Sequence, residues 1–360
     1  MKTLLRLLLK SQHQRNRSAP AQTDKGMTLV ELLVGSIMAF LIITPMIGFV
    51  VDMLNTDRRE QVKSNTEQDV QAALDFIAQD LSQAIYIYDN NPTTISTPTT
   101  TATGIPALLA GNFLPQNPNE TPILVFWKRE LMKNSMPVSL GDKPNECQPI
   151  GTKPCNDTYV LALVAYYQVK EPNAIWCQPS GNPCPTRIIR YQIKDGLRDP
   201  SSTNTDPLQR YFTDVTLAQE RSPAFNPRFD ISNPTQNVTI VAEVPNDFRN
   251  PEVLVNYIDH SQKEIDPLEC QKALGNPTTQ TGTTKAPIEE KNLRVTDTGS
   301  PTNTNSFYAC VDTARNVARV TIRGNSLRRI QNDKAEYEAK KAAYFPTASV
   351  QVQGLGARGK

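Results

Sequence analysis

The chain has few histidines, no marked excess of positive or negative charge and few long apolar runs. Only two histidines, His13 and His260, occur among its 360 residues, and they lie far apart, which argues against a histidine-based metal site. The 38 basic and 36 acidic residues nearly balance, whereas nucleic-acid-binding proteins usually carry a clustered basic excess. The mean hydropathy of −0.44 excludes a protein with many membrane spans.

The short motifs of catalytic and metal sites are also missing. The sequence has no C-x-x-C pair, no H-E-x-x-H, no G-x-S-x-G and no D-x-[DN]-x-[DN]-G calcium loop. A Ser-His-Asp triad would have to use His260, which we expect at the surface. Gly354, Gly356 and Gly359 with Lys360 match most of a phosphate-loop pattern, but that loop needs a following helix, so we expect a flexible tail. The sequence therefore predicts no enzyme, no cofactor and no metal site.

One long apolar run is present. Residues 27–51 carry a single ionisable side chain, Glu31. At 1.5 Å per residue, a helix of this length spans about 37 Å, enough to cross a hydrocarbon core of about 30 Å. A buried helix in a soluble core is the alternative, although such helices rarely lack a polar face. Pro45 predicts a helix kink or a melted turn within the run. We expect a membrane-spanning helix over residues 27–54.

The charges that flank this run give its orientation. Residues 1–26 carry six Lys or Arg and one Asp, and the remainder of the chain is net negative. Because the basic flank of a membrane segment stays in the cytoplasm, we expect the C-terminal body in the periplasm or outside the cell. An ordinary secretory signal would be cleaved after its apolar stretch, and no A-x-A-like site follows residue 51.

The pattern of residues 55–90 predicts that the helix continues with two different faces. Apolar side chains recur at the helical period at Val70, Leu74, Ile77, Leu81, Ile85 and Tyr88. The expected polar face holds Asp69, Gln71, Asp75, Gln79, Asp80 and Gln83. This second half should lie on a sheet, while the first half protrudes into a membrane or filament. The Thr/Pro-rich residues 91–120 should form an exposed loop.

The start of the apolar run carries a recognisable signal, Lys25-Gly26-Met27-Thr28-Leu29-Val30-Glu31-Leu32-Leu33. It resembles the class III signal of type IV pilins and pseudopilins, with Met27 in place of the commoner Phe. The resemblance implies that residues 1–26 are a leader, that a prepilin peptidase cuts between Gly26 and Met27, and that the new N-terminus is methylated. It also implies an α+β, pilin-like fold, in which the long N-terminal helix packs on an antiparallel β-sheet with long loop insertions.

Glu31 would be the fifth residue of the processed chain. A carboxylate in an apolar helix costs about 2.5–3.5 kcal/mol at the bilayer centre, so it usually has a partner. By the resemblance, that partner is the Met27 amine of a neighbouring subunit, and the pairing sets the axial register during filament assembly. The alternative is that Glu31 only reaches the lipid headgroups.

Residues 121–360 are expected to form an external β-rich body. Short apolar runs separated by Pro, Asn and Gly predict antiparallel strands over residues 123–127, 159–167, 187–193, 238–242, 316–322 and 349–352. The polar segments 196–235 and 272–305 look like insertions, where we expect any subunit-specific function. The charged residues 334–341 predict a short helix.

All six cysteines lie in this expected external body, and their even number suggests disulfides in an oxidising compartment. Six cysteines allow fifteen pairings. We favour the pairs Cys147–Cys155 and Cys177–Cys184, which close short loops, and Cys270–Cys310, which would pin a long insertion to the sheet. A zinc site is the competing interpretation.

The resemblance implies a structural role in the plasma (inner) membrane and then in a filament. The chain would be a minor pilin or pseudopilin of a type IV pilus or a secretion pseudopilus, priming assembly or sitting at the tip. The pseudopilins linked to polysaccharide secretion and motility in filamentous cyanobacteria, and the minor pseudopilins of type II secretion, are similar in plan. The expected partners are the prepilin peptidase, other pilin or pseudopilin subunits, the inner-membrane assembly platform and membrane lipid.

Two other functions stay open. The body could be a pilus-borne adhesin or polysaccharide-binding tip, with Trp127, Trp176 or the Thr-rich insertions contacting the ligand, although core packing is the simpler role of both tryptophans. A single-span membrane protein with an external enzymatic domain is the third possibility, and it predicts an uncleaved leader.

Overall fold

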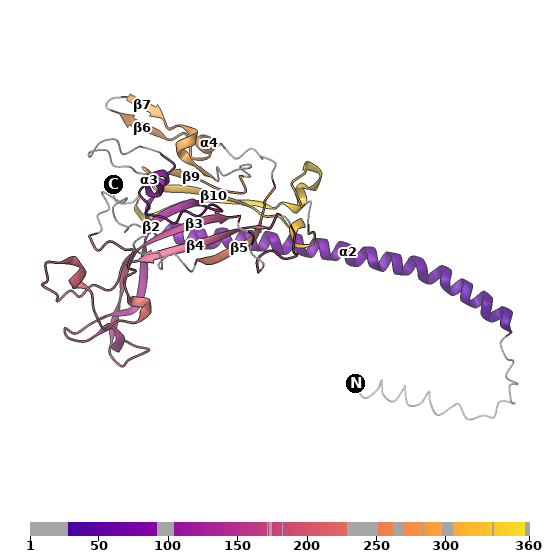
Figure 1. The fold of residues 1–360 in the computed structure, drawn as a ribbon, viewed down its shortest axis with the longest axis horizontal. Helices are drawn as coiled ribbons and strands as arrows, with labels where there is room; N and C mark the ends of the chain where they lie inside the picture. Colours follow the sequence, from indigo (N-terminus) through magenta and orange to yellow (C-terminus); the bar gives the residue numbers. More distant parts are fainter. Residues whose placement is uncertain are drawn as a thin grey trace, which may run out of the picture. The chain divides into compact units, whose positions relative to one another are not determined.

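The structure is a computed structural model that describes residues 28–91, 104–170, 172, 175–181, 183–228, 251–261, 269–281, 284–296, 305–332 and 335–356. The chain divides into two compact units, Met1–Arg58 and Arg59–Lys360. The fold is α+β, with the 54-residue helix α2 (Leu29–Ser82) followed by antiparallel sheets (Figure 1).

Helix α2 is continuous. It runs through Pro45 without a break, so the melted turn considered there is wrong. Within the second unit, α2 buries one face at the helical period, which confirms the apolar stripe expected for this part of the chain. The buried residues of α2 are Thr66, Val70, Ala73, Leu74, Ile77, Asp80 and Leu81.

Helix α2 ends six residues earlier than its apolar spacing predicts. It stops at Ser82, and strand β1 (Ala84–Ile87) follows almost at once. Ile85 therefore lies in a strand and Tyr88 just after it, although both continue the helical spacing. The β-branched and aromatic side chains of residues 85–88 favour a strand, and pairing with a neighbouring strand satisfies their backbone groups.

The first sheet has five antiparallel strands in the order β1-β2-β3-β4-β5. Its remaining strands are β2 (Glu120–Pro137), β3 (Cys155–Val169), β4 (Thr186–Lys194) and β5 (Glu252–Ile258). The second sheet has the order β11-β10-β9-β8, with β8 (Arg294–Thr296), β9 (Phe307–Asp312), β10 (Val317–Arg323) and β11 (Thr347–Gln353). Strands β6 (Thr278–Thr281) and β7 (Thr284–Pro287) form a separate hairpin.

Five of the six strands expected from the sequence correspond to β2, β3, β4, β10 and β11. The structure extends four of them, whereas β10 is shifted by one residue from the expected range 316–322. The sixth, residues 238–242, lies outside the described residues. Strands β1, β5, β8 and β9 were not expected. Strand β9 begins two residues after the expected insertion ends, and the sequence predicted no element there.

The two segments expected to lack regular structure contain some. Residues 91–120 include the short helix α3 (Ile105–Ala110), and residues 272–305 include β6, β7, helix α5 (Glu290–Leu293) and β8. A further short helix, α4 (Cys270–Ala273), begins two residues before this second segment and ends within it. The helix expected over residues 334–341 is a 3₁₀ helix at Ala339–Tyr344. The Thr/Pro-rich residues 92–103 lie outside the described residues.

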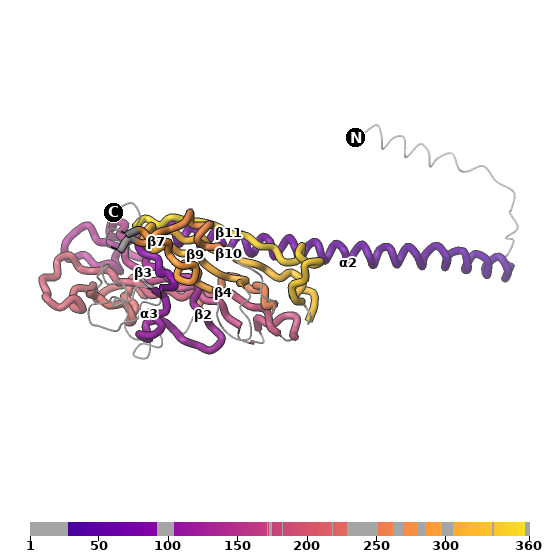
Figure 2. The backbone as a smooth tube through the Cα atoms, turned by 90° about the horizontal axis from the view of Figure 1, so that it is seen from above, coloured from indigo at the N-terminus to yellow at the C-terminus, as the bar shows by residue number. Residues whose placement is uncertain are grey.

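The core of the second unit joins the end of α2 to both sheets. In Figures 1 and 2 the strands run beside this part of the helix. Trp127 of β2 is fully buried, and its indole N–H donates a 2.9 Å hydrogen bond to the Tyr88 hydroxyl. Gly324, after β10, lies so close to α2 that an added Cβ would be 2.6 Å from the Thr66 methyl carbon. The simpler role expected of Trp127, core packing, is confirmed, whereas Trp176 is half-buried.

Candidate functional site

The first half of α2 exposes apolar side chains on every side of the helix. The exposed large residues are Leu29, Val30, Leu32, Leu33, Val34, Ile37, Met38, Phe40, Leu41, Ile42, Ile43, Met46, Ile47, Phe49, Val50, Val51, Met53 and Leu54. By length and composition this is the part of α2 that is able to cross a membrane. Such a surface is unstable in water, so it needs lipid or other apolar helices around it.

At the beginning of α2, Thr28 and Glu31 cap each other. The Glu31 Oε2 atom accepts hydrogen bonds from the Thr28 backbone N–H at 3.3 Å and from the Thr28 hydroxyl at 3.2 Å. The Thr28 hydroxyl oxygen in turn accepts the Glu31 backbone N–H at 3.3 Å. This is the capping box that the spacing T-x-x-E specifies, so the sequence itself carries the signal for the beginning of α2. Gly26 and Met27 lie outside the described residues.

Pro45 removes one N–H from the helical ladder, so the carbonyl of Leu41 loses its partner. The hydroxyl of the preceding residue, Thr44, donates a 2.8 Å hydrogen bond to the carbonyl of Phe40. This bond goes to the carbonyl one residue before Leu41, so it does not replace the backbone bond that Pro45 removes.

The second half of α2 is attached to the first sheet through Asp80. Its carboxylate lies 2.9 Å from Lys128 Nζ of β2 and 2.9 Å from Arg190 Nε of β4, and it accepts a 2.7 Å hydrogen bond from the Tyr166 hydroxyl of β3. Burial alone would raise the pKa of Asp80, but Arg190 and Lys128 hold that pKa below its usual value. We placed Asp80 on the polar face of the helix, and this was wrong: it lies three residues after Ile77, on the buried face.

The six cysteines form three disulfides with the pairing favoured from the sequence, Cys147–Cys155, Cys177–Cys184 and Cys270–Cys310. They leave no thiolate for a zinc ion. Within the described residues, no group of three His, Cys, Asp or Glu side chains could hold a metal. The longest-range disulfide joins α4 to β9, so it fixes the segment that we expected to be an insertion.

His260 is buried, and the expectation that it lies at the surface was wrong. Burial lowers the pKa of His260 to about 4, against the opposing effect of Asp259, and the positive charge of Arg328 lowers it further. The Asp259 carboxylate accepts hydrogen bonds from the Ser261 hydroxyl at 2.5 Å and from Arg323 Nε at 2.8 Å. The Asp and Ser beside His260 are thus joined to each other and to Arg323 in a buried network.

The glycines near the C-terminus pack against β1, so residues 354–356 do not form the flexible tail that we expected. A Cβ at Gly354 would lie 2.3 Å from the Ala84 carbonyl oxygen, and one at Gly356 would lie 2.0 Å from that of Ile85. Only glycine permits so close an approach of two backbones. Residues 357–360, which include the last glycine and lysine of the motif, lie outside the described residues.

Comparison of the chain with protein-family models, curated proteins and solved structures gave no match. The architecture itself is pilin-like, since a long apolar N-terminal helix packs against antiparallel sheets. One membrane-capable helix, together with three disulfides, indicates a membrane-anchored or secreted protein.

Proposed function

We propose that this protein is a minor pilin or pseudopilin, a structural and non-enzymatic subunit that primes a type IV pilus or secretion pseudopilus or occupies its tip. The observation that carries the proposal is the division of α2. Residues 29–54 expose apolar side chains all round, whereas residues 66–81 bury one face against sheets. A subunit built in this way leaves the bilayer only if its first half enters another apolar environment, which a bundle of such helices provides.

Glu31 would guide that transfer. Cleavage after Gly26 would create an α-amine at Met27, which is positively charged near neutral pH. In an apolar bundle, a carboxylate and an amine of two neighbouring chains stabilise each other, while either alone is costly. The capping bonds from Thr28 satisfy the Glu31 carboxylate within one chain. We infer that the amine of a neighbouring subunit replaces them during assembly.

The remaining partners follow from this proposal. The prepilin peptidase would act on the cytoplasmic side, and the assembly platform would receive the subunit from the membrane. The body would lie in the periplasm or outside the cell, where disulfides persist. Its size suits a tip position better than a repeated position along a shaft. Secretion and motility, including polysaccharide secretion, are the processes in which such a filament would act.

Processing tests the proposal directly. The protein should be purified from its native membranes and examined by intact mass and N-terminal sequencing. We expect a chain that starts at Met27 and is heavier by one methyl group. A Gly26→Val variant should keep its leader, because a branched side chain obstructs the scissile bond. Gly35→Val is the matched control, since an added Cβ at Gly35 meets nothing within 4 Å. A native chain that starts at Met1 would contradict the proposal.

A further inference from the structure

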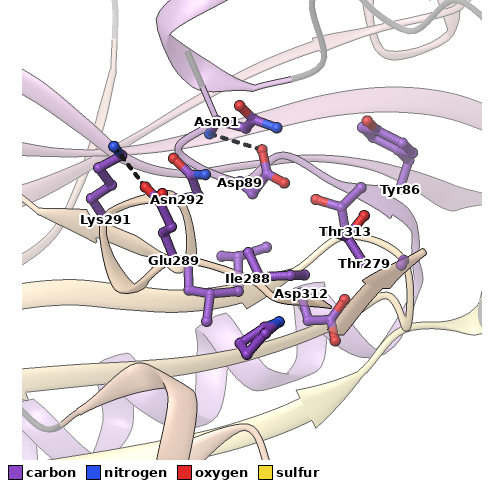
Figure 3. Close-up of a pocket in the computed structure, with 14 residues that line it drawn as sticks. Tyr86, Asp89, Asn91, Thr279, Ile288, Glu289, Lys291, Asn292, Asp312 and Thr313 are labelled. Carbon is purple, nitrogen blue, oxygen red and sulfur yellow. Dashed lines mark hydrogen bonds and ion pairs between the residues drawn. The ribbon is translucent and has the colours of Figure 1, made fainter. Parts of the chain in front are cut away.

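A cavity of about 650 Å³ lies beside the end of β1, in a part of the body that the filament proposal does not use. We call it the hairpin cavity, because Thr279 and Pro287 of the β6–β7 hairpin belong to its lining. Figure 3 shows its lining, which comes from four places. These are the end of β1 with Tyr86 and Asp89, strand β6 with Thr279, the segment from β7 to α5 with Ile288 and Asn292, and residues 311–314 at the end of β9. Its volume lies within the range of about 300–1,000 Å³ that is usual for small-molecule sites.

The walls of the hairpin cavity are held in place by bonds that cross between segments distant in sequence. The Asn90 backbone N–H donates a 3.0 Å hydrogen bond to the Asn292 carbonyl, and the Asn90 side chain donates to the Lys291 carbonyl at 2.9 Å. Cys310 directly precedes the lining residue Val311, and its disulfide with Cys270 joins β9 to α4. The cavity is therefore a preformed feature of the body.

The lining combines an aromatic ring with hydrogen-bonding groups. Tyr86 meets the ring of Tyr88 edge to face, with 5.0 Å between ring centroids, which fixes its orientation. Asp89 Oδ1 accepts the Asn91 backbone N–H at 3.0 Å. The side-chain oxygen of Asn292 is enclosed, and no donor among the described residues reaches it. Rotation of this amide presents either its oxygen or its nitrogen as a further hydrogen-bonding group.

The charges of the lining are mostly negative. Glu289 is paired with Lys291 at 2.6 Å, and Asp312 is paired with Arg315. Asp89 has no such cationic partner among the ion pairs of the described residues, and burial raises its pKa. An anionic ligand would meet carboxylates in this cavity, whereas a ligand rich in hydroxyl groups would meet acceptors.

We propose that the hairpin cavity binds a short segment of a neutral polysaccharide. The face of a sugar ring carries C–H groups that pack on an aromatic side chain such as Tyr86. Its hydroxyl groups donate to carboxylates and exchange hydrogen bonds with amides, the chemistry of Asp89, Asn91 and Asn292. Ile288 adds an apolar surface in the same cavity. The acidic lining disfavours uronate, sulfate and phosphate groups.

This binding is independent of processing and assembly. A body that binds no glycan would leave the filament proposal in place, and a glycan-binding protein with an uncleaved leader would leave the cavity proposal in place. The filament proposal is therefore tested by processing of the leader, and the cavity proposal by glycan binding.

The test uses the full chain in lipid nanodiscs on a glycan microarray that carries neutral hexose oligomers and uronate- or sulfate-bearing oligomers. We expect retention of neutral oligomers. Tyr86→Ala and Asn292→Ala should each weaken it by about tenfold, while Tyr86→Phe should keep it because the ring remains. The matched control is Tyr159→Ala, which removes an exposed tyrosine of β3. Equal thermal midpoints of the variants would establish that the body stays folded.

Three results would overturn the proposal. The first is no retention of any neutral oligomer by the folded wild-type protein. The second is a preference for uronate or sulfated oligomers. The third is binding by folded Tyr86→Ala and Asn292→Ala variants at the wild-type level, which would place a glycan site elsewhere.

Discussion

Asp80 of α2 and Arg190 of β4 form a buried ion pair, with 2.9 Å between the carboxylate Oδ2 and the guanidinium Nε. Both side chains are about nine-tenths buried. Lys128 and Tyr166 complete the surroundings of the carboxylate. The helix is thus attached to three neighbouring strands through one charge. Because only one face of α2 carries this carboxylate, the network also fixes the rotation of the helix about its axis.

An Asp80→Asn variant removes the negative charge at nearly constant size. Arg190 and Lys128 would lose the buried carboxylate that they share and keep only the longer contacts to Glu252 at 3.5 Å and to Glu130 at 3.8 Å. We therefore expect a loss of about 3–5 kcal/mol in the free energy of unfolding. Urea unfolding followed by tryptophan fluorescence measures it. Asp75→Asn, an exposed position on the same helix, should change stability by less than about 0.5 kcal/mol. Equal effects of the two variants would show that the buried network does not anchor α2.

His260 makes the body sensitive to mild acid. Its folded-state pKa of about 4 lies below the value of about 6.5 in an unfolded chain. Between these values the unfolded state binds more protons, so stability falls as pH falls. The full loss down to pH 4 is about 3 kcal/mol at 1.36 kcal/mol per pKa unit.

The measurement is the free energy of unfolding between pH 7 and pH 5. The pKa of Asp80 is lowered from 3.8, so the stability that this carboxylate contributes is lost only below about pH 3.8. Asp80 therefore does not contribute to the slope between pH 7 and pH 5. A His260→Gln variant should show a flatter profile than the wild type. If the two profiles have the same slope, protonation of His260 is not the cause.

Much of the body could be predicted from the sequence because periodicity and cysteine spacing are local signals. Val70, Leu74, Ile77 and Leu81 form the expected stripe, and the three disulfides have the favoured pairing. The predicted end of α2 was wrong because Ile85 and Tyr88 continue the helical spacing. The pairing of β1 with β2 determines that residues 84–87 form a strand. The burial of His260 and the hairpin cavity depend on segments that meet only in the folded chain.

The three disulfides should differ in their contribution to stability. Cys270 and Cys310 are separated by 40 residues, whereas Cys147 and Cys155 are separated by 8. The chain-entropy model gives about 4 kcal/mol for the longer loop and about 2.5 kcal/mol for the shorter one. Replacing each pair by two alanines and comparing the thermal midpoints tests this order. A larger loss for the shorter loop would mean that native packing, and not the restricted unfolded chain, governs these bonds.

Glu31→Gln separates processing from assembly. Glutamine retains the length of the side chain and accepts the Thr28 hydrogen bonds, so the beginning of α2 should persist and the leader should still be removed after Gly26. The charge is lost, and with it the attraction to the amine of a neighbouring subunit, so we expect incorporation into sheared filaments to fall by about tenfold or more while the amount in the membrane stays unchanged. Immunoblots of both fractions measure this, with Glu60→Gln as the control for an exposed glutamate farther along α2. Normal incorporation of the Glu31→Gln variant would refute the pairing, and Glu31 would then act only as the cap of its own helix.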